Sequence, residues 1–160
     1  MEHITVQPDT RKGSFPIAIV VSLFNTSITQ ALKMGALQRL KEYGFLEQDI
    51  LLVEVPGAIE IPIVAQQIAK NNRARAIIAL GCVVRGETTH YECVFEQINY
   101  GCQRVALDYN LPVIFEVLMT ENEEQALDRV GGYHGHKGVS AVDCAVDMVG
   151  ILQQLNRPSQ

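Results

Sequence analysis

The sequence predicts an α/β protein: a three-layer sandwich in which a four-stranded parallel sheet is flanked by helices on both faces. Two observations support this class. Four apolar runs are continuous instead of alternating with polar residues, which is typical of strands buried on both faces. Segments with helical apolar spacing separate these runs, and such alternation gives parallel sheets with right-handed crossovers. With 160 residues, of which 48% are apolar, the chain is long enough for one domain with its own core.

The first half of the chain has two strands and two helices. The runs IAIVVS and ILLVEV predict the strands, and Pro56 and Gly57 form a turn after the second. Apolar residues at helical spacing lie between the two runs, and Gly44 follows them as a C-cap. The predicted elements are strands over 17–22 and 50–55 and helices over 27–43 and 59–70.

The second half has two further strands, predicted by the runs AIIALGCVV and VIFEVL. A long helical pattern between them ends before Asn110 and Pro112. The stretch GGYHGHKG is predicted as a loop that leads into the last helix. The predicted elements are strands over 76–84 and 113–118 and helices over 89–108, 121–130 and about 139–155.

Residues 1–15 are polar without periodicity and predict an N-terminal arm, followed by one α/β domain over 16–160. The arm has no apolar core of the kind found in signal peptides, and no apolar run is long enough to span a membrane. We therefore expect a cytoplasmic protein. The net charge of −5, without a basic cluster, argues against nucleic-acid binding.

The four cysteines follow no C-x-x-C spacing and lie inside apolar runs, which predicts reduced, buried thiols. They are Cys82, Cys93, Cys102 and Cys144. His90 and Cys93 are one helical turn apart and could ligate a metal, but no second close pair completes a site. We therefore expect no metal.

Polar residues or glycine follow all four predicted strands, and ligands of open parallel sheets bind at the carboxyl ends of the strands. Phe24 and Asn25 follow the first strand, Glu60 lies after the second, and the third runs into RGETTH. In this last stretch Thr89 and Glu92 match a capping box, so the helix is expected to begin at His90.

The start of that helix has the character of an anion site. Gly86 allows close backbone approach, and the free N–H groups near Thr88 together with the helix dipole favour a phosphate. The same dipole disfavours an imidazolium at His90, and a neutral histidine can exchange protons in both directions.

Each candidate also has a plainer structural interpretation. A first-turn histidine is more often a surface residue than a catalyst, and carboxylates are stabilised at helix starts whatever their function. The structural alternatives are a helix-start carboxylate for Glu60, core for Phe24, a helix cap for Asn25, a helix-end cation for Arg129, and solvated loop residues for His134, His136 and Lys137.

Taken together, these motifs closely resemble the lumazine synthase family from about residue 15 to 155. The block GCVVRGETTH is specific, and VPGAIEIP is nearly so. The resemblance is carried by Phe24-Asn25, residues 55–62, 81–90 and 112–115, Thr120-Glu121-Asn122 and His136-Lys137-Gly138. It implies a flavodoxin-like fold and a transferase of riboflavin biosynthesis that condenses 5-amino-6-(ribitylamino)uracil with 3,4-dihydroxy-2-butanone 4-phosphate without a cofactor.

The resemblance also implies roles for individual residues. Phe24 would stack on the pyrimidine, with Asn25 beside it, and His90 would be the proton donor. Phe115, from a neighbouring subunit, would close the aromatic side, and Lys137 would lie near the site. The remaining implied contacts are Ala58, Ile59 and Glu60 with the ribityl chain, Cys82, Val83 and Val84 with the pyrimidine and ribityl groups, and Gly86, Glu87, Thr88 and Arg129 with the phosphate.

Three positions depart from the family pattern. Ile59 stands where an aromatic residue is common, so stacking there would be weaker. Cys82 replaces a frequent threonine or alanine, which a backbone contact would survive. A carboxylate at Glu87 would repel phosphate, so only its backbone is expected to contribute.

The family assembles as pentamers, and in many bacteria as an icosahedral shell; its N-terminal arm often adds to a neighbour's sheet. We therefore expect a homopentamer, with a shell as the favoured larger assembly. Other classes stay open at this point: a same-fold pentameric riboflavin synthase, a flavodoxin-like carrier, and a flavin-binding or shell protein without activity. A phosphoacceptor receiver is disfavoured, because Phe24 and Arg85 stand where it needs acidic residues.

Overall fold

The computed structural model describes residues 1–157 and confirms the predicted parallel sheet. The strands pair in the order β2-β1-β3-β4, and every pair is parallel. β4 runs two residues further than predicted, since Met119 and Thr120 still pair with the end of β3. The strands are β1 (Ile17–Ser22), β2 (Ile50–Val55), β3 (Ala76–Val84) and β4 (Val113–Thr120).

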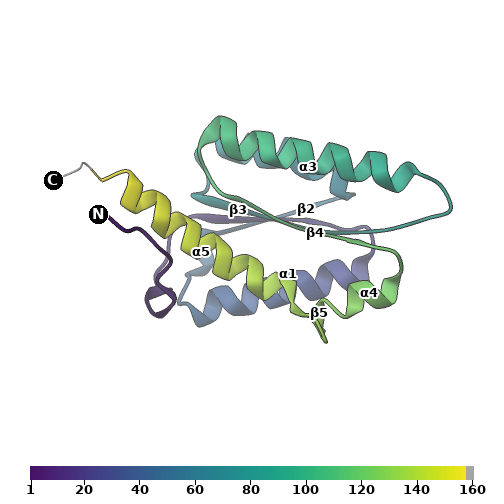
Figure 1. Cartoon of the computed structure of the whole chain (residues 1–160), viewed down its shortest axis with the longest axis horizontal. Coiled ribbons are helices and arrows are strands. Elements are labelled where there is room, and N and C mark those ends of the chain that lie inside the picture. Colours follow the sequence, from purple (N-terminus) through teal and green to yellow (C-terminus); the bar gives the residue numbers. More distant parts are fainter. Residues whose placement is uncertain (158–160) are drawn as a thin grey trace.

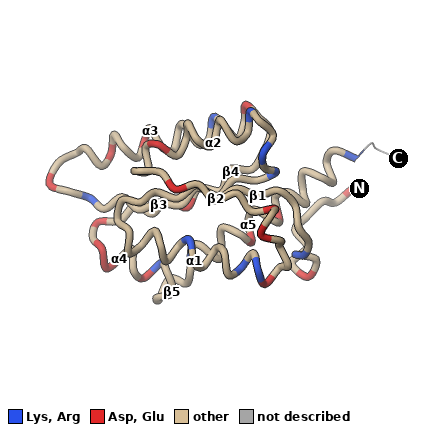
Figure 2. Tube along the Cα trace, turned by 180° about the vertical axis from the view of Figure 1, so that it is seen from behind, with Lys and Arg blue, Asp and Glu red and all other residues tan. Residues whose placement is uncertain are grey.

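Helices cover both faces of this sheet, as Figures 1 and 2 show: α2 and α3 form one layer, and α1, α4 and α5 the other. Their bounds are α1 (Thr26–Glu42), α2 (Ile61–Lys70), α3 (His90–Tyr109), α4 (Glu123–Leu127) and α5 (Lys137–Leu155). Three single 3₁₀ turns, Pro8–Thr10, Glu47–Asp49 and Ala58–Glu60, complete the elements. Within residues 1–157, none of the helices has the length and apolarity needed to cross a membrane.

The core consists of two clusters, one on each face of the sheet. Alternate residues of β1 serve the two sides: Ile17, Ile19 and Val21 pack under α1 and α5, while Ala18 and Val20 pack under α2 and α3. This alternation explains the continuous apolar runs, because both faces of each central strand must be apolar. Except for Glu54 on β2 and Glu116 on β4, the charged residues lie on helices and loops, where both signs are interspersed (Figure 2).

The largest difference from the predicted elements lies between residues 121 and 138. Of the predicted helix over 121–130, only α4 is helical. The predicted glycine-rich loop is instead a small antiparallel hairpin of β5 (Val130–Gly132) and β6 (Gly135–His136). Gly131 and Gly135 have φ angles of 110° and 73°, which favour glycine and permit the hairpin. Two strands of three and two residues leave no apolar periodicity to detect. α5 starts directly after them.

Smaller differences concern the helix ends. The predicted helix over 59–70 begins as the 3₁₀ turn Ala58–Glu60, and only α2 itself is α-helical. The C-cap prediction at Gly44 is confirmed: its φ is 84°, and its N–H donates to the carbonyl of Lys41 at 3.0 Å.

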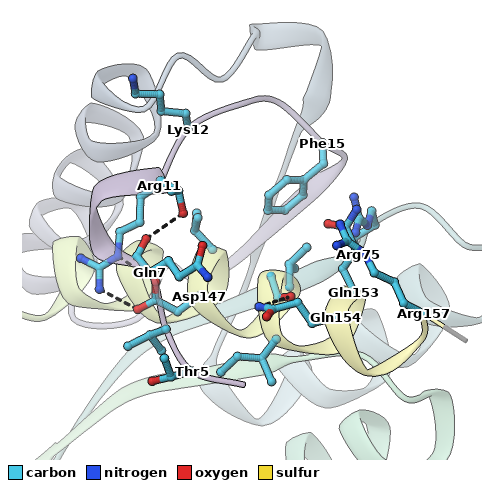
Figure 3. Close-up of a pocket in the computed structure, with 16 residues that line it drawn as sticks. Thr5, Gln7, Arg11, Lys12, Phe15, Arg75, Asp147, Gln153, Gln154 and Arg157 are labelled. Atoms are coloured by element: carbon cyan, nitrogen blue, oxygen red, sulfur yellow. Dashed lines mark hydrogen bonds and ion pairs between the residues drawn. The ribbon is translucent and has the colours of Figure 1, made fainter. Parts of the chain in front are cut away.

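The N-terminal arm packs against α5 of its own chain. This contact lies at the amino ends of the strands, opposite to their carboxyl ends. Figure 3 shows Arg11 directed at Asp147, to which its Nε and Nη2 donate at 2.8 and 2.6 Å. A cavity of about 330 Å³ lies between the arm and α5. The domain prediction for residues 16–160 extends past Arg157, so its last three residues lie outside the described part of the chain.

Asp143 is the centre of the charged network beside the arm. Arg39 donates to it through Nε at 2.8 Å, Tyr43 donates its hydroxyl, and Arg11 lies at 3.6 Å. Burial raises the pKa of Asp143, but the hydrogen bonds from Arg39 and Tyr43 outweigh it and hold the pKa below its usual range.

Because its folded-state pKa is lowered, ionised Asp143 stabilises the fold at pH values above its unfolded-state pKa of about 4. This stabilisation is lost as the pH falls through the folded-state pKa. We expect the thermal midpoint to fall below about pH 5, and to fall less steeply in Asp143→Asn, which carries no charge to lose. Melting curves between about pH 3 and 7 measure this. Parallel curves for the two proteins would contradict the assignment to Asp143.

Candidate functional site

A cavity of about 400 Å³ lies at the carboxyl edge of the sheet, where the chain segments after β1, β2 and β3 meet. Its size is within the range of small-molecule sites. β1 and β3 are neighbours whose connections leave in opposite directions, which is where open α/β sheets bind ligands. It is lined by Phe24, Asn25, Gly57, Ala58, Ile59, Glu60, Cys82, Val83, Val84, Gly86, Thr88, His90, Tyr91 and Val94.

The segment after β1 contributes an exposed ring and a structural amide. The side chain of Phe24 is 70% exposed, so it is not core, and it borders the cavity. Asn25 occupies the N-cap position of α1 in the left-handed region, with φ at 59°, but its side chain does not cap the helix. Its Nδ2 instead donates to the carbonyl of Cys82 at 2.8 Å and joins the ends of β1 and β3.

The end of β3 forms the floor of the cavity. Cys82 is buried, and burial raises the pKa of its thiol to about 11, so the thiol is protonated and a poor nucleophile at neutral pH. Val83 and Val84 are half-buried and lie at the same strand end. Because these three side chains are apolar or inert, the polar groups that this part of the cavity offers are those of the backbone.

The segment after β2 forms the wall through its 3₁₀ turn. Ala58 is buried, whereas Ile59 and Glu60 are exposed. A Cβ built on Gly57 would lie 2.9 Å from Oε2 of Glu60, so the carboxylate folds back over this glycine. The turn therefore presents one apolar side chain and one carboxylate to the cavity.

The loop after β3 leads to His90, the first residue of α3, as predicted. The capping box is wrong: Thr89 has φ −74° and ψ 3°, outside the extended conformation usual at N-caps, and its side chain makes no capping bond. Thr88 accepts the N–H of His90 at 3.3 Å instead. The carboxylate of Glu92 lies 3.9 Å from Arg85, away from the helix N-terminus.

Arg85 ties this loop to the end of β4. Its N–H donates to the carbonyl of Thr120 at 2.9 Å, and its Nη1 donates to Glu121 at 3.4 Å. The loop that carries Gly86 and Thr88 is therefore fixed at its first residue. Both of these residues line the cavity and are exposed.

Four predicted site residues do not line the cavity of their own chain. Glu87 is exposed beside it. Phe115 lies on the edge strand β4 and packs edge-on against Phe95, with ring centroids 6.4 Å apart. Arg129 lies between α4 and β5, and Lys137 is the first residue of α5, so both are on the side of the other helical layer.

The charge of the cavity follows from which residues line it and which do not. Among residues 1–157, the titratable side chains that line the cavity are Glu60, Cys82, His90 and Tyr91. No lysine or arginine of these residues lines it. The start of α3 supplies a partial positive charge through its dipole, worth only about 0.3–1 kcal/mol at an exposed site. One chain alone therefore offers an apolar, hydrogen-bonding cavity that lacks a strong anion partner.

Arg129 and Lys137 are anchored next to each other by the β5–β6 hairpin. The N–H of Lys137 donates to the carbonyl of Arg129 at 2.8 Å, and Nη1 of Arg129 donates to the carbonyl of Gln125 at 2.7 Å. Burial raises the pKa of Glu116 on β4, and the ammonium of Lys137 partly offsets this shift. The backbones of the two residues are thus held together, and one donor of the Arg129 guanidinium is fixed.

Sequence reasoning missed three lining residues, Gly57, Tyr91 and Val94. Val94 lies four residues after His90 on the same helix face, and this spacing could have identified it. Tyr91 is half-buried and could not have been separated from core by pattern alone.

The cysteine and histidine interpretations need correction. Cys93 and Cys144 are exposed rather than buried, because they point away from the apolar face of their helices. His136, expected to face solvent, is half-buried with its Nδ1 enclosed. Among the described residues, no three His, Cys, Asp or Glu side chains gather into a group that could hold a metal ion.

Comparison with known proteins gives a consistent result. The family model described as 6,7-dimethyl-8-ribityllumazine synthase matches residues 14–153. A relative named 6,7-dimethyl-8-ribityllumazine synthase from Coxiella burnetii (strain RSA 493 / Nine Mile phase I) is 47% identical over 144 residues, covering 90% of this chain and 95% of the relative. A relative of the same name from Pediococcus pentosaceus is 47% identical over 141 residues, covering 88% of this chain and 90% of the relative.

These matches extend through every segment that lines the cavity. They favour lumazine synthase over a same-fold riboflavin synthase and over a flavin-binding or shell protein without activity. The chain belongs to the 6,7-dimethyl-8-ribityllumazine synthase family, whose members are transferases of riboflavin biosynthesis.

Proposed function

We propose that the chain condenses 5-amino-6-(D-ribitylamino)uracil with 3,4-dihydroxy-2-butanone 4-phosphate to 6,7-dimethyl-8-ribityllumazine, releasing phosphate and water. This is the penultimate step of riboflavin biosynthesis. The observation that carries the proposal is the cavity at the carboxyl edge of the sheet, which gathers Phe24, Glu60 and His90 around one space of about 400 Å³.

The uracil and its ribityl chain occupy the part of the cavity between β1 and the 3₁₀ turn. Phe24 stacks on the pyrimidine, since an exposed aromatic ring beside an apolar wall is suited to a flat heterocycle. Ala58, Ile59 and Glu60 contact the ribityl chain, whose hydroxyls can donate to the carboxylate. Backbone groups of residues 82–84 bind the polar edges of the pyrimidine.

The butanone phosphate binds at the start of α3. Gly86 and Thr88 border this part of the cavity, and the backbone of Glu87 lies between them. The carboxylate of Glu87 is exposed and can point to solvent. A phosphate dianion also needs a strong cation, and a guanidinium matches its oxygens better than an ammonium does.

Arg129 of a second copy of the chain supplies that cation, with Lys137 beside it and Phe115 closing the aromatic side. The support is twofold: no lysine or arginine of residues 1–157 lines the cavity of its own chain, and Phe24 is 70% exposed at its mouth. The protein is accordingly a homo-oligomer with sites at its subunit contacts. By family resemblance we propose a pentamer, and an icosahedral shell as its larger assembly.

The reaction uses these groups in sequence. The aromatic amine attacks the ketone, and water leaves to give an imine. Phosphate is then eliminated, and ring closure with loss of a second water requires further proton transfers. His90 carries protons between these sites, and the reaction uses no cofactor. Holding both substrates together can itself contribute about 7–11 kcal/mol.

Incubation of the purified protein with both substrates tests the proposal directly. We expect the fluorescence of the lumazine product to appear, together with one phosphate released per product. A riboflavin synthase would instead consume added lumazine and form riboflavin. A flavin-binding or shell protein would give neither change, and that outcome would reject the proposed activity.

A further inference from the structure

The imidazole of His136 fills a notch on helix α1 that exists because residue 35 is glycine. A Cβ built on Gly35 would lie 2.1 Å from Cε1 of His136 and 2.6 Å from each ring nitrogen. These distances are far shorter than any contact a methyl group tolerates, so the ring occupies the space of a missing side chain. The β5–β6 hairpin is thereby fitted directly onto the backbone of α1.

A second close contact lies one turn earlier on α1. A Cβ on Gly138 would lie 2.2 Å from the carbonyl oxygen of Leu32, so the start of α5 also touches the α1 backbone. Leu32 and Gly35 are three residues apart and face the same way on the helix. Together the two contacts fix where the hairpin ends and where α5 begins.

The position of His136 is transmitted to Arg129 by the hairpin itself. Val130 pairs with His136 across the two strands, and the N–H of Lys137 donates to the carbonyl of Arg129 at 2.8 Å. Only one of the five N–H groups of the Arg129 side chain is bonded within the described residues, to the carbonyl of Gln125. The backbone of Arg129 is thus held by the hairpin, while most of its guanidinium donors remain for a ligand.

The His136 ring fits the space beside Gly35 by its shape and not by hydrogen bonding of its Nδ1. Nδ1 of His136 is buried and has no hydrogen-bond partner among residues 1–157. An unpaired buried nitrogen is unfavourable, and a simple apolar residue would avoid that cost. The flat ring therefore occupies the space beside Gly35 in spite of its polarity.

We propose that His136 is a positioning residue for phosphate binding: its ring in the Gly35 notch sets the position of the hairpin and so of the Arg129 guanidinium. This inference rests on the proposed role of Arg129 in binding the phosphorylated substrate. His136 itself touches no substrate.

Four variants test it by steady-state kinetics with each substrate varied: Gly35→Ala, His136→Ala, the double variant, and Gly150→Ala. Gly35→Ala drives a methyl group into the ring and is expected to raise the KM for the butanone phosphate about 10-fold, since small displacements of binding groups cost up to ~100-fold. The KM for the ribitylaminouracil and kcat at saturation should change less than about twofold. Gly150→Ala, a helical glycine with open space at its Cβ, is the matched control and should leave both KM values unchanged.

The double variant separates positioning from damage to the core. Removing the ring makes room for the new methyl group, and that methyl group partly fills the space that His136→Ala leaves empty. Gly35→Ala/His136→Ala should therefore have a lower KM for the butanone phosphate than either single variant. If Gly35→Ala does not fold, the same comparison between His136→Ala and the double variant decides the question. A lowered thermal midpoint with unchanged KM values, equal increases for both substrates, or no recovery in the double variant would overturn the proposal.

The proposed function fails in a distinguishable way. It fails if the wild-type protein makes no lumazine, or if Arg129→Ala leaves the KM for the butanone phosphate unchanged. The positioning proposal fails if the wild-type protein is active and Arg129→Ala raises the KM for the butanone phosphate, but Gly35→Ala and His136→Ala leave that KM unchanged.

Discussion

Replacing Arg129 with alanine is expected to raise the KM for the butanone phosphate by roughly 10- to 100-fold, because hydrogen bonds to charged groups contribute about 1.5–3 kcal/mol. The cavity supports this size of effect, since no lysine or arginine among residues 1–157 lines it in its own chain. The KM for the ribitylaminouracil should change little. Steady-state kinetics with each substrate varied in turn measures both constants.

Arg129→Lys is the matched control for this prediction. It keeps the positive charge but loses the planar fork that contacts two phosphate oxygens at once, so it should recover only part of the affinity. Thermal midpoints of both variants should be recorded, because Arg129 also donates to the carbonyl of Gln125. An unchanged KM for the butanone phosphate in a stable Arg129→Ala protein would refute the role.

Replacing His90 with alanine is expected to lower kcat by about 10²- to 10⁴-fold without abolishing activity, which is the usual contribution of a positioned acid–base group. The residual rate comes from holding the two substrates together, which the variant leaves intact. Both KM values should remain close to those of the wild-type protein. Product fluorescence at saturating substrates measures the change in kcat.

Tyr91→Phe is the control for His90→Ala, because Tyr91 lines the same cavity on the next position of α3. Loss of its hydroxyl should leave kcat within a few-fold of the wild-type value, because no group that transfers protons in the proposed reaction is removed. If Tyr91→Phe slows the reaction as much as His90→Ala does, or if His90→Ala is fully active, the proton-transfer role belongs to another group.

The sheet was predictable because its central strands, β1 and β3, are buried on both faces. β1 and β3 are apolar along nearly their whole lengths, a pattern typical of strands buried on both faces. The hairpin of β5 and β6 was not predictable, because its register depends on two glycines with positive φ and on contacts with α1. Tertiary contact, rather than local preference, decides such short elements.

The predicted site residues also fall into those that could be placed from the sequence and those that could not. Phe24, Glu60 and His90 could be placed together from the sequence, because parallel strands bring their carboxyl ends to one edge. Arg129 and Lys137 could not, since neither lines the cavity of its own chain. Spacing along a chain contains no information about which copy of that chain completes a site.

The expected behaviour of His136 was wrong for a related reason. A histidine between glycines is typical of a solvated loop, and only the missing side chain of Gly35, about a hundred residues away, makes room for its ring. Likewise, the side chain of Asn25 stabilises the ends of two strands and does not cap α1. Both roles depend on contacts that are remote in sequence.

Mixing two impaired variants tests most directly whether the cavity is completed by a second chain. His90→Ala and Arg129→Ala proteins are each refolded alone and then refolded together, and activity is measured below the KM of the Arg129→Ala variant for the butanone phosphate. If the site is shared, some contacts in the mixture pair an intact His90 with an intact Arg129, and about a quarter of the wild-type activity should return for random mixing. A mixture no more active than the mean of the two separate preparations would contradict a site formed between chains.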